Sequence, residues 1–318
     1  MHQGYDLIGD VHGCGKTLIQ LLEQMGYSKS NGVYKHKSRK VVFLGDIIDR
    51  GPNIRLACEV VRGMVDAGNA YMIMGNHEYN AVTYMTPSPA GVEHPYLRPH
   101  TKRNSFIVEQ TVAQFANHPK ELKEYLEWFT ELPLFLEFEH FRVVHACWDQ
   151  EMIDEFVSRY GGNQLHKGLL SKSVTPNTFL FKFLDRILRG TSLKLPGNRS
   201  MTAKDGMVRQ FFRTKFWAQN PQIYSDVAFQ PDPLPSELTH LRLSEDEKEK
   251  LLYYPETEKP LFFGHYWMSG VPAVIRSNIA CLDYSAVKYG RLVAYRMDNE
   301  KQLNNGKFTW VRVEKSER

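Results

Sequence analysis

The sequence predicts an α/β fold, and two observations support that prediction. Within residues 1–80, short apolar runs of strand length alternate with segments of helical periodicity. Near the C-terminus, runs of strand length follow one another at 261–263, 279–282, 291–297 and 308–313. Alternating strands and helices are typical of a sheet with at least partly parallel strands. We therefore expect an α/β start and a β-rich closing region around one core.

The N-terminal part contains three predicted strands and two predicted helices. Largely apolar runs of four residues predict strands at 5–8, 41–44 and 71–74. Between them, apolar side chains recur three and four positions apart and predict helices at 17–25 and 54–65. The resulting βαβαβ order favours parallel pairing of these strands.

The next elements are a loop, a helical region and a strand pair. Residues 85–104 are rich in Pro and His, which predicts a long loop. Two helices are expected across 105–130. The apolar runs at 134–138 and 141–144 flank Glu139-His140, which predicts paired strands joined by a tight turn.

The least regular part of the sequence is 150–255. It mixes helical pieces with a basic stretch at 186–204, expected to be a loop, and a Pro-rich stretch at 221–235. We expect residues 1–318 to form a single domain in which 150–255 is an inserted, mostly helical and loop segment.

Composition excludes several classes of protein. A content of 42% hydrophobic and 24% charged residues excludes intrinsic disorder for most of the chain. Because 40 Lys and Arg nearly balance 36 Asp and Glu, specific nucleic-acid binding is not expected. No signal-peptide pattern or apolar run of about 20 residues occurs. The four cysteines are scattered, so we expect a cytoplasmic protein with reduced thiols and no membrane partner.

Potential metal ligands follow predicted strands at five places in the sequence. These clusters are Gly9-Asp10-Val11-His12-Gly13, Gly45-Asp46-Ile47-Ile48-Asp49-Arg50-Gly51, Gly75-Asn76-His77-Glu78, His145 and Gly264-His265. Loops at the carboxyl ends of strands build the ligand site in α/β sheets, so we expect the five clusters to meet. Carboxylate, imidazole and amide oxygen together suit divalent Mn, Fe or Zn.

The clusters also contain residues suited to phosphoryl transfer. Two metal ions about 3.5–4 Å apart can activate a water and clamp a phosphoryl group. His77 could protonate a leaving oxygen, and Asp49 could orient its imidazole. Arg50 provides the fork-shaped donor that matches phosphate oxygens. Asp10 and Asp46 are the natural carboxylate ligands.

The three long clusters resemble the signature blocks of calcineurin-like metallophosphoesterases. The Asp49-Arg50-Gly51 ending resembles the phosphoprotein-phosphatase branch, and within it bacterial symmetrical diadenosine tetraphosphatases and bacterial Ser/Thr protein phosphatases. The resemblance covers 9–78, with weaker matches at His145, at Gly264-His265 and across 278–295. It implies a central β-sandwich flanked by helices, in four α/β/β/α layers.

The resemblance also implies roles for individual residues. One metal ion would take Asp10, His12 and Asp46; the other would share Asp46 and add Asn76, His145 and His265. The ions would be manganese first, with iron, zinc or cobalt as alternatives, and a bridging hydroxide would attack phosphorus directly. His77, paired with Asp49, would be the general acid. Arg50 would bind phosphate together with a second arginine, for which Arg209 is the candidate and Arg213, Arg199 and Arg186 are rivals.

Two departures from the family pattern concern aromatic residues. Trp148 follows His145 closely, where many relatives have small residues, and it either packs in the core or stacks on a substrate ring. Tyr266-Trp267 follows His265, where bacterial relatives often have Thr-Pro.

Three functions are compatible with this sequence. The first is a metal-dependent hydrolase of phosphate monoesters, acting on phosphoprotein Ser/Thr or on small phosphorylated molecules. The second is a symmetrical hydrolase of dinucleoside polyphosphates such as diadenosine tetraphosphate. The third is a non-catalytic metal-binding regulatory module, which the combination of Asp49, Arg50 and His77 disfavours, because metal binding alone requires neither an acid nor a phosphate clamp.

Overall fold

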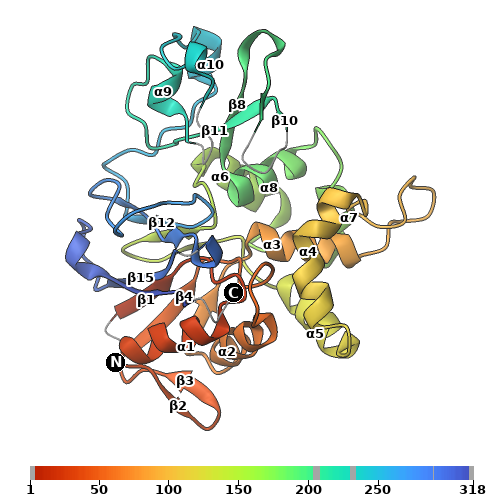
Figure 1. Cartoon of the computed structure of the whole chain (residues 1–318), viewed down its shortest axis with the longest axis vertical. Coiled ribbons are helices and arrows are strands. Elements are labelled where there is room, and N and C mark those ends of the chain that lie inside the picture. The colour runs from red at the N-terminus through yellow and green to blue at the C-terminus, as the bar shows by residue number, and fades with distance from the viewer. Residues whose placement is uncertain (1–3, 203–207, 230–233, 289, 315–318) are drawn as a thin grey trace.

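Two β-sheets form the centre of the molecule in this computed structural model, which describes residues 4–202, 208–229, 234–288 and 290–314 (Figure 1). In the larger sheet the strand order is β14-β15-β1-β4-β5, with β16 also pairing β15. Its strands are β1 (Gly4–Ile8), β4 (Arg39–Phe43), β5 (Ala70–Met72), β14 (Asp283–Tyr284), β15 (Arg291–Met297) and β16 (Phe308–Arg312). In the smaller sheet the order is β13-β12-β7-β6, with β6 (Phe135–Glu137), β7 (Arg142–Val144), β12 (Leu261–Phe263) and β13 (Ile279–Cys281).

The strand directions bring the predicted clusters together. Strands β1, β4 and β5 pair in parallel, as the βαβαβ pattern predicts. Strands β7, β12 and β13 are also parallel, whereas β6 pairs antiparallel with β7 as the predicted hairpin. Within each parallel set, the carboxyl ends lie at one edge, and all five clusters follow such ends.

Alternate residues of the central strands face two different cores. Leu7, Val42 and Phe262 belong to a core between the sheets, together with Tyr295 and Val143. Their neighbours Ile8, Val41 and Phe263 belong instead to a core shared with the helices. Because side chains alternate along a strand, each sheet is covered on both faces. This arrangement confirms the expected α/β fold with a central sandwich flanked by helices.

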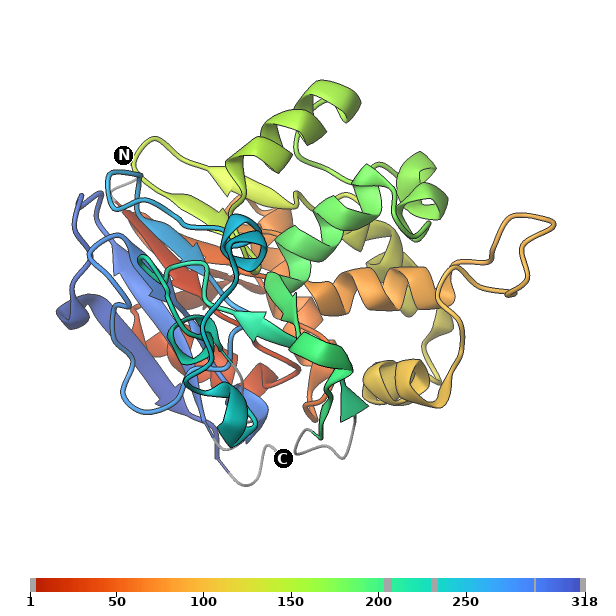
Figure 2. The ribbon, with the colours of Figure 1, turned by 90° about the horizontal axis from the view of Figure 1, so that it is seen from above.

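The helices cover the outer faces of the two sheets. Helices α1 (Gly15–Gln24) and α2 (Ile54–Asp66) contact strands of the larger sheet. Helix α3 (Asn76–Met85) begins within the third cluster, and α4 (Lys102–Gln114) and α5 (Pro119–Phe129) pack beside it. On the other side, Phe156 of α6 (Gln150–Tyr160) stacks on Phe183 of α8 (Phe179–Arg189), with α7 (Leu170–Ser173) nearby. Figure 2 shows the green helices of this second group beside the sheets.

The 150–255 segment contains a small core of its own. Strands β8 (Thr191–Lys194) and β11 (Phe211–Thr214) form a hairpin above the sandwich (Figure 1). Phe212 packs against Tyr224 there, in a cluster separate from the two main cores. The segment also contains β9 (Met201–Thr202), β10 (Val208–Arg209), α9 (Tyr224–Val227) and α10 (Glu245–Glu249). The expected basic loop at 186–204 is therefore wrong at the end of α8 and at strands β8 and β9; residues 203 and 204 lie outside the described residues. The division into domains stays a prediction.

A hairpin formed by β2 (Ser28–Ser30) and β3 (Val33–Lys35) was not expected from the sequence. It is too short and polar to show a strand periodicity. In the part of the chain that the structure describes, no helix combines the length and apolar character that crossing a membrane requires.

Candidate metal centre

The backbone of the clusters adopts unusual conformations. His12, Asp46, Asp49, Arg50 and His265 all have positive φ angles, between 45° and 68°. Residues with a Cβ rarely adopt this left-handed region, and such strain is concentrated at functional sites. The strand-end loops therefore turn sharply enough to point their side chains at one another.

Two glycines make room for carboxylates. A Cβ at Gly264 would lie 2.0 Å from Oδ1 of Asp10, and one at Gly75 would lie 2.2 Å from Oδ1 of Asp46. Neither position could therefore have a side chain without displacing a carboxylate. This explains why glycine precedes the polar residues in these clusters.

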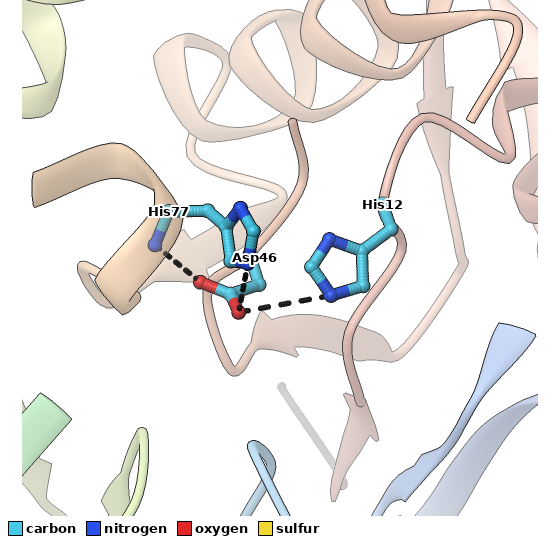
Figure 3. Close-up of side chains that lie close together, drawn as sticks. All are labelled: His12, Asp46 and His77. Atoms are coloured by element: carbon cyan, nitrogen blue, oxygen red, sulfur yellow. Dashed lines mark hydrogen bonds and ion pairs between the residues drawn. The ribbon is translucent and has the colours of Figure 1, made fainter. Parts of the chain in front are cut away.

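The Asp46 carboxylate lies at the centre of the site. Its Oδ2 is 3.8 Å from Nε2 of His12, 3.9 Å from Nε2 of His77 and 3.4 Å from Nε2 of His145. Figure 3 shows Asp46 between His12 and His77. Two groups of ligand atoms close enough to share an ion contain Asp46: one with His12 and His77, the other with His145 and His265. One carboxylate common to two sets fits a pair of divalent ions.

The remaining predicted ligands border the same centre. Oδ1 of Asn76 is 3.1 Å from Nε2 of His145. The backbone N–H of His265 donates to Oδ2 of Asp10 at 3.1 Å. Burial raises the pKa of Asp10 well above its usual value, and the nearby carboxylates of Asp283 and Asp46 raise it further. Several buried carboxylates so close together favour a bound cation as their counter-charge.

The histidine orientations also fit metal binding. Nδ1 of His12 lies 3.0 Å from the carbonyl oxygen of Ile48, and Nδ1 of His145 lies 2.7 Å from that of Leu44. When each Nδ1–H donates to its carbonyl, the lone pair of Nε2 faces Asp46. Metal-binding histidines are typically held by such a backbone acceptor. Burial and the charge of Arg50 lower the pKa of His12, which keeps it neutral.

His77 forms a hydrogen-bonded chain with Asp49, its predicted partner, and with Arg50. Its Nδ1 lies 2.6 Å from Oδ2 of Asp49, which accepts this hydrogen bond. On the other side, Nη2 of Arg50 donates to Nε2 of His77 at 3.2 Å. Asp49 is buried and accepts a second hydrogen bond from the hydroxyl of Thr111 in α4. Thr111 was missed because its position in the middle of a helix gives no sequence signal.

Glu78 is a second residue that sequence reasoning did not assign. Its carboxylate accepts from three backbone N–H groups: Gly75 at 2.9 Å, Asp46 at 2.7 Å and Ile47 at 2.8 Å. The second and third clusters are therefore tied together by one fully buried side chain. Burial raises the pKa of Glu78 to about 7. The sequence offered one indication of this role, because Glu78 directly follows His77 in the third cluster.

Among the four arginines considered from the sequence, Arg213 contacts a predicted ligand. Its guanidinium donates to Nε2 of His265 at 2.8 Å and to the carbonyl oxygen of His265 at 3.2 Å. Arg209 is half-buried on β10, and its assignment as the second phosphate-binding residue stays a prediction. Arg186 forms an ion pair with Asp149, and Arg199 donates to the carbonyl of Pro196.

Trp148 belongs to the core. It is 2% exposed, its indole N–H donates to Gln150, and the ring of Phe135 packs edge-on against it. This environment favours packing over contact with a substrate ring.

Two curated bacterial proteins are similar to part of this chain. A bis(5'-nucleosyl)-tetraphosphatase PrpE (asymmetrical) from Oceanobacillus iheyensis is 32% identical over 147 residues, covering 44% of this chain and 54% of the relative. The protein of that description from Halalkalibacterium halodurans is 30% identical over 158 residues, covering 49% and 61%. The chain thus spans little more than half the length of these curated relatives.

A solved structure and a family model extend the comparison. The cold-active protein-tyrosine phosphatase of a Shewanella species superposes with a TM-score of 0.50 at 17% identity, over 99% of this chain and 81% of that one, which shows a shared fold. The sequence model of the calcineurin-like phosphoesterases matches residues 6–170, just over half of the chain. The chain therefore belongs to the calcineurin-like phosphoesterase family.

Proposed function

We propose that this protein is a metal-dependent hydrolase of phosphoester or phosphoanhydride bonds. The observation that carries the proposal is the position of Asp46, whose carboxylate is common to two groups of potential metal ligands. Two divalent ions bound here would supply an activated water and neutralise charge on a phosphoryl group. We propose manganese, with iron, zinc or cobalt as alternatives, because nitrogen and oxygen ligands suit all four.

The chain's own residues would divide the work as follows. Asp10, His12 and Asp46 would hold one ion; Asp46, Asn76, His145 and His265 would hold the other. The ligand set proposed for the first ion contains Asp10, whereas the group of close ligand atoms in the structure contains His77 together with His12 and Asp46. We keep His77 as the acid because its Nδ1 is engaged by Asp49 and its Nε2 is engaged by Arg50.

Proton transfer would use the chain from Asp49 to Arg50. Asp49 accepts from Nδ1 of His77 and so orients the ring, whose Nε2 would donate a proton to a leaving oxygen. In the structure, the Arg50 guanidinium donates to Nε2 of His77. A bound phosphoryl group would accept the guanidinium hydrogen bonds in its place. Displacing the guanidinium in this way frees Nε2 for its proton.

Dinucleoside polyphosphates are the substrate class that the named relatives favour. Both relatives carry the description asymmetrical tetraphosphatase, whereas the motif resemblance suggested symmetrical cleavage. Phosphate monoesters, on proteins or small molecules, are the second candidate, because the exposed Arg50 at the site can clamp a single phosphoryl group. A cytoplasmic location belongs to the same proposal.

A manganese-supplemented assay of three compounds tests the function. Diadenosine tetraphosphate, a Ser/Thr phosphopeptide and p-nitrophenyl phosphate are each incubated with the full chain and with Asp46→Asn as the inactive control. Turnover of the tetraphosphate to ATP and AMP would support asymmetrical cleavage, and two ADP would support symmetrical cleavage. Absence of turnover of all three compounds would reject the proposed function.

A further inference from the structure

The ring of Trp267 contacts two cationic side chains beside the metal centre. The guanidinium carbon of Arg50 is 5.1 Å from the centroid of the Trp267 ring, and Nζ of Lys288 is 3.7 Å from the same centroid. Because both distances are measured to the same ring centroid, the two charged groups can be no farther apart than the sum of the two distances. Trp267 is half-buried, whereas Arg50 and Lys288 are exposed. One ring therefore contacts both Arg50 and a second exposed cation, Lys288.

The backbone explains why these three residues meet. Trp267 comes two residues after His265, in the loop that follows β12. Lys288 ends a short 3-10 helix at Ala286–Lys288, directly after β14. The N–H of Met268 donates to the carbonyl of Asp283 at 3.0 Å, which fixes one loop against the other. The ring and the lysine are thus positioned by the same framework as the metal centre.

The electrostatics of this arrangement favour an anion. Two like charges near each other repel, and a multiply charged anion that contacts both is attracted to both. Arg50 is already placed to hold the phosphoryl group that reacts, through its contact with Nε2 of His77. Lys288, which contacts the same Trp267 ring, adds a point charge, a type of donor that commonly binds phosphate. A single phosphoryl group held by Arg50 would not contact Lys288, whereas a chain of phosphoryl groups could contact both side chains.

We propose that Trp267 and Lys288 form a subsite for the distal phosphoryl groups of a polyphosphate chain, and that Lys288 determines the preference for phosphoanhydrides over monoesters. This inference rests on the proposed function for its catalytic consequence, but not for binding. Arg50 would hold the phosphoryl group under attack, and Lys288 would hold one farther along the chain. The Trp267 ring sets the spacing between them.

The catalytic test compares two substrates in three variants of the full chain. We expect Lys288→Gln to lower kcat/KM for diadenosine tetraphosphate about tenfold, mainly through KM, because one charged contact is lost. Turnover of p-nitrophenyl phosphate should stay within about twofold of the unmodified protein. Lys288→Arg should restore the tetraphosphate activity, since it keeps the charge. Lys29→Gln is the matched control, because Lys29 lies over the ring of Tyr34, 6.0 Å from its centroid, in the β2–β3 hairpin.

A binding test separates this inference from the proposed function. Inorganic tripolyphosphate and orthophosphate are titrated calorimetrically into the full chain without added metal. We expect Lys288→Gln to weaken tripolyphosphate binding about tenfold and to leave orthophosphate unchanged. Equal tripolyphosphate affinity in Lys288→Gln and Lys29→Gln would overturn the subsite. If no compound is hydrolysed, the proposed function fails, and this titration still decides the subsite.

Discussion

Asp10 occupies the space that any side chain at position 264 would need. A Cβ built on Gly264 falls 2.0 Å from Oδ1 of Asp10, and the next backbone N–H, that of His265, donates to the same carboxylate. The two residues come from different sheets, since Asp10 follows β1 and Gly264 follows β12. Contact between backbone and carboxylate thus joins the two halves of the sandwich at the candidate metal centre.

Gly264→Ala should therefore weaken metal binding. The added methyl group displaces the Asp10 carboxylate, and changes beside a metal ligand typically cost about 10–100-fold in affinity. Manganese affinity, measured by titration calorimetry, is the readout. Gly168→Ala is the matched control because a Cβ there meets nothing within 4 Å. Equal affinity in both variants would show that Asp10 does not bind the metal.

His77→Ala tests whether this residue is the acid or a ligand. If His77 is the acid, the variant should lose about 10²–10⁴-fold in kcat and keep its metal content. If His77 is a ligand, the variant should lose metal as well, which elemental analysis would detect. Asp49→Asn should reproduce the loss of kcat with metal retained, because the amide lacks the negative charge and has one acceptor oxygen for two donors, Nδ1–H of His77 and the hydroxyl of Thr111. His140→Ala, at an exposed position, is the control.

Asp46→Asn should weaken both metal ions together. Its carboxylate is common to both ligand groups, and an amide lacks the charge that holds two cations. Metal content after dialysis, determined by elemental analysis, should fall for both equivalents. Loss of a single equivalent would rule out the bridging role.

Glu78→Gln should destabilise the fold. In this variant an NH2 group replaces one of the two carboxylate oxygens, and this donor would face backbone N–H groups that donate to Glu78 in the structure. The free energy of unfolding should therefore fall by about 3 kcal/mol. Chemical denaturation without metal measures this value. Glu59→Gln, at an exposed position of α2, should change it by less than about 0.5 kcal/mol. A similar small change in both variants would contradict the tethering role of Glu78.

Metal binding should release protons near neutral pH. Burial disfavours the charged form of His145, but the Asp46 carboxylate outweighs burial and raises the His145 pKa to about 10. The ion pair of His145 with Asp46 contributes its full stability to the metal-free protein when the pH is below the usual histidine pKa of about 6.5. This contribution is lost as the pH rises through about 10. An ion must displace this proton, so manganese affinity should rise with pH between 7 and 8. Calorimetry in two buffers of different ionisation enthalpy should give different heats; identical heats would contradict the prediction.

Regular periodicity explains which elements the sequence could predict. The strands around Leu7, Val42 and Phe262 are apolar on both faces because each sheet is covered twice, and this makes them visible as short apolar runs. The strand-end clusters were visible for a related reason, because polar blocks such as Gly9–Gly13 interrupt those runs. Parallel pairing then brings the clusters to one edge of each sheet.

The contacts that escaped prediction join residues that lie far apart in the sequence. Thr111 meets Asp49 because α4 packs beside α2 and α3, and no local pattern encodes that packing. Arg213 reaches His265 from a hairpin whose strands are short and irregular. The Arg50–Trp267–Lys288 arrangement likewise depends on three separate loops. Such contacts follow from tertiary packing, which a single sequence does not display.

The spread of the ligands along the chain bears on the order in which the protein is made. Under the proposed assignment, one ion needs residues between 10 and 46, whereas the other needs residue 265 as well. A ribosome delivers the first set more than two hundred residues before His265. The second ion can therefore bind with its full ligand set only after residue 265 has been synthesised and β12 has joined the sheet, so the two ions would enter at different stages of synthesis.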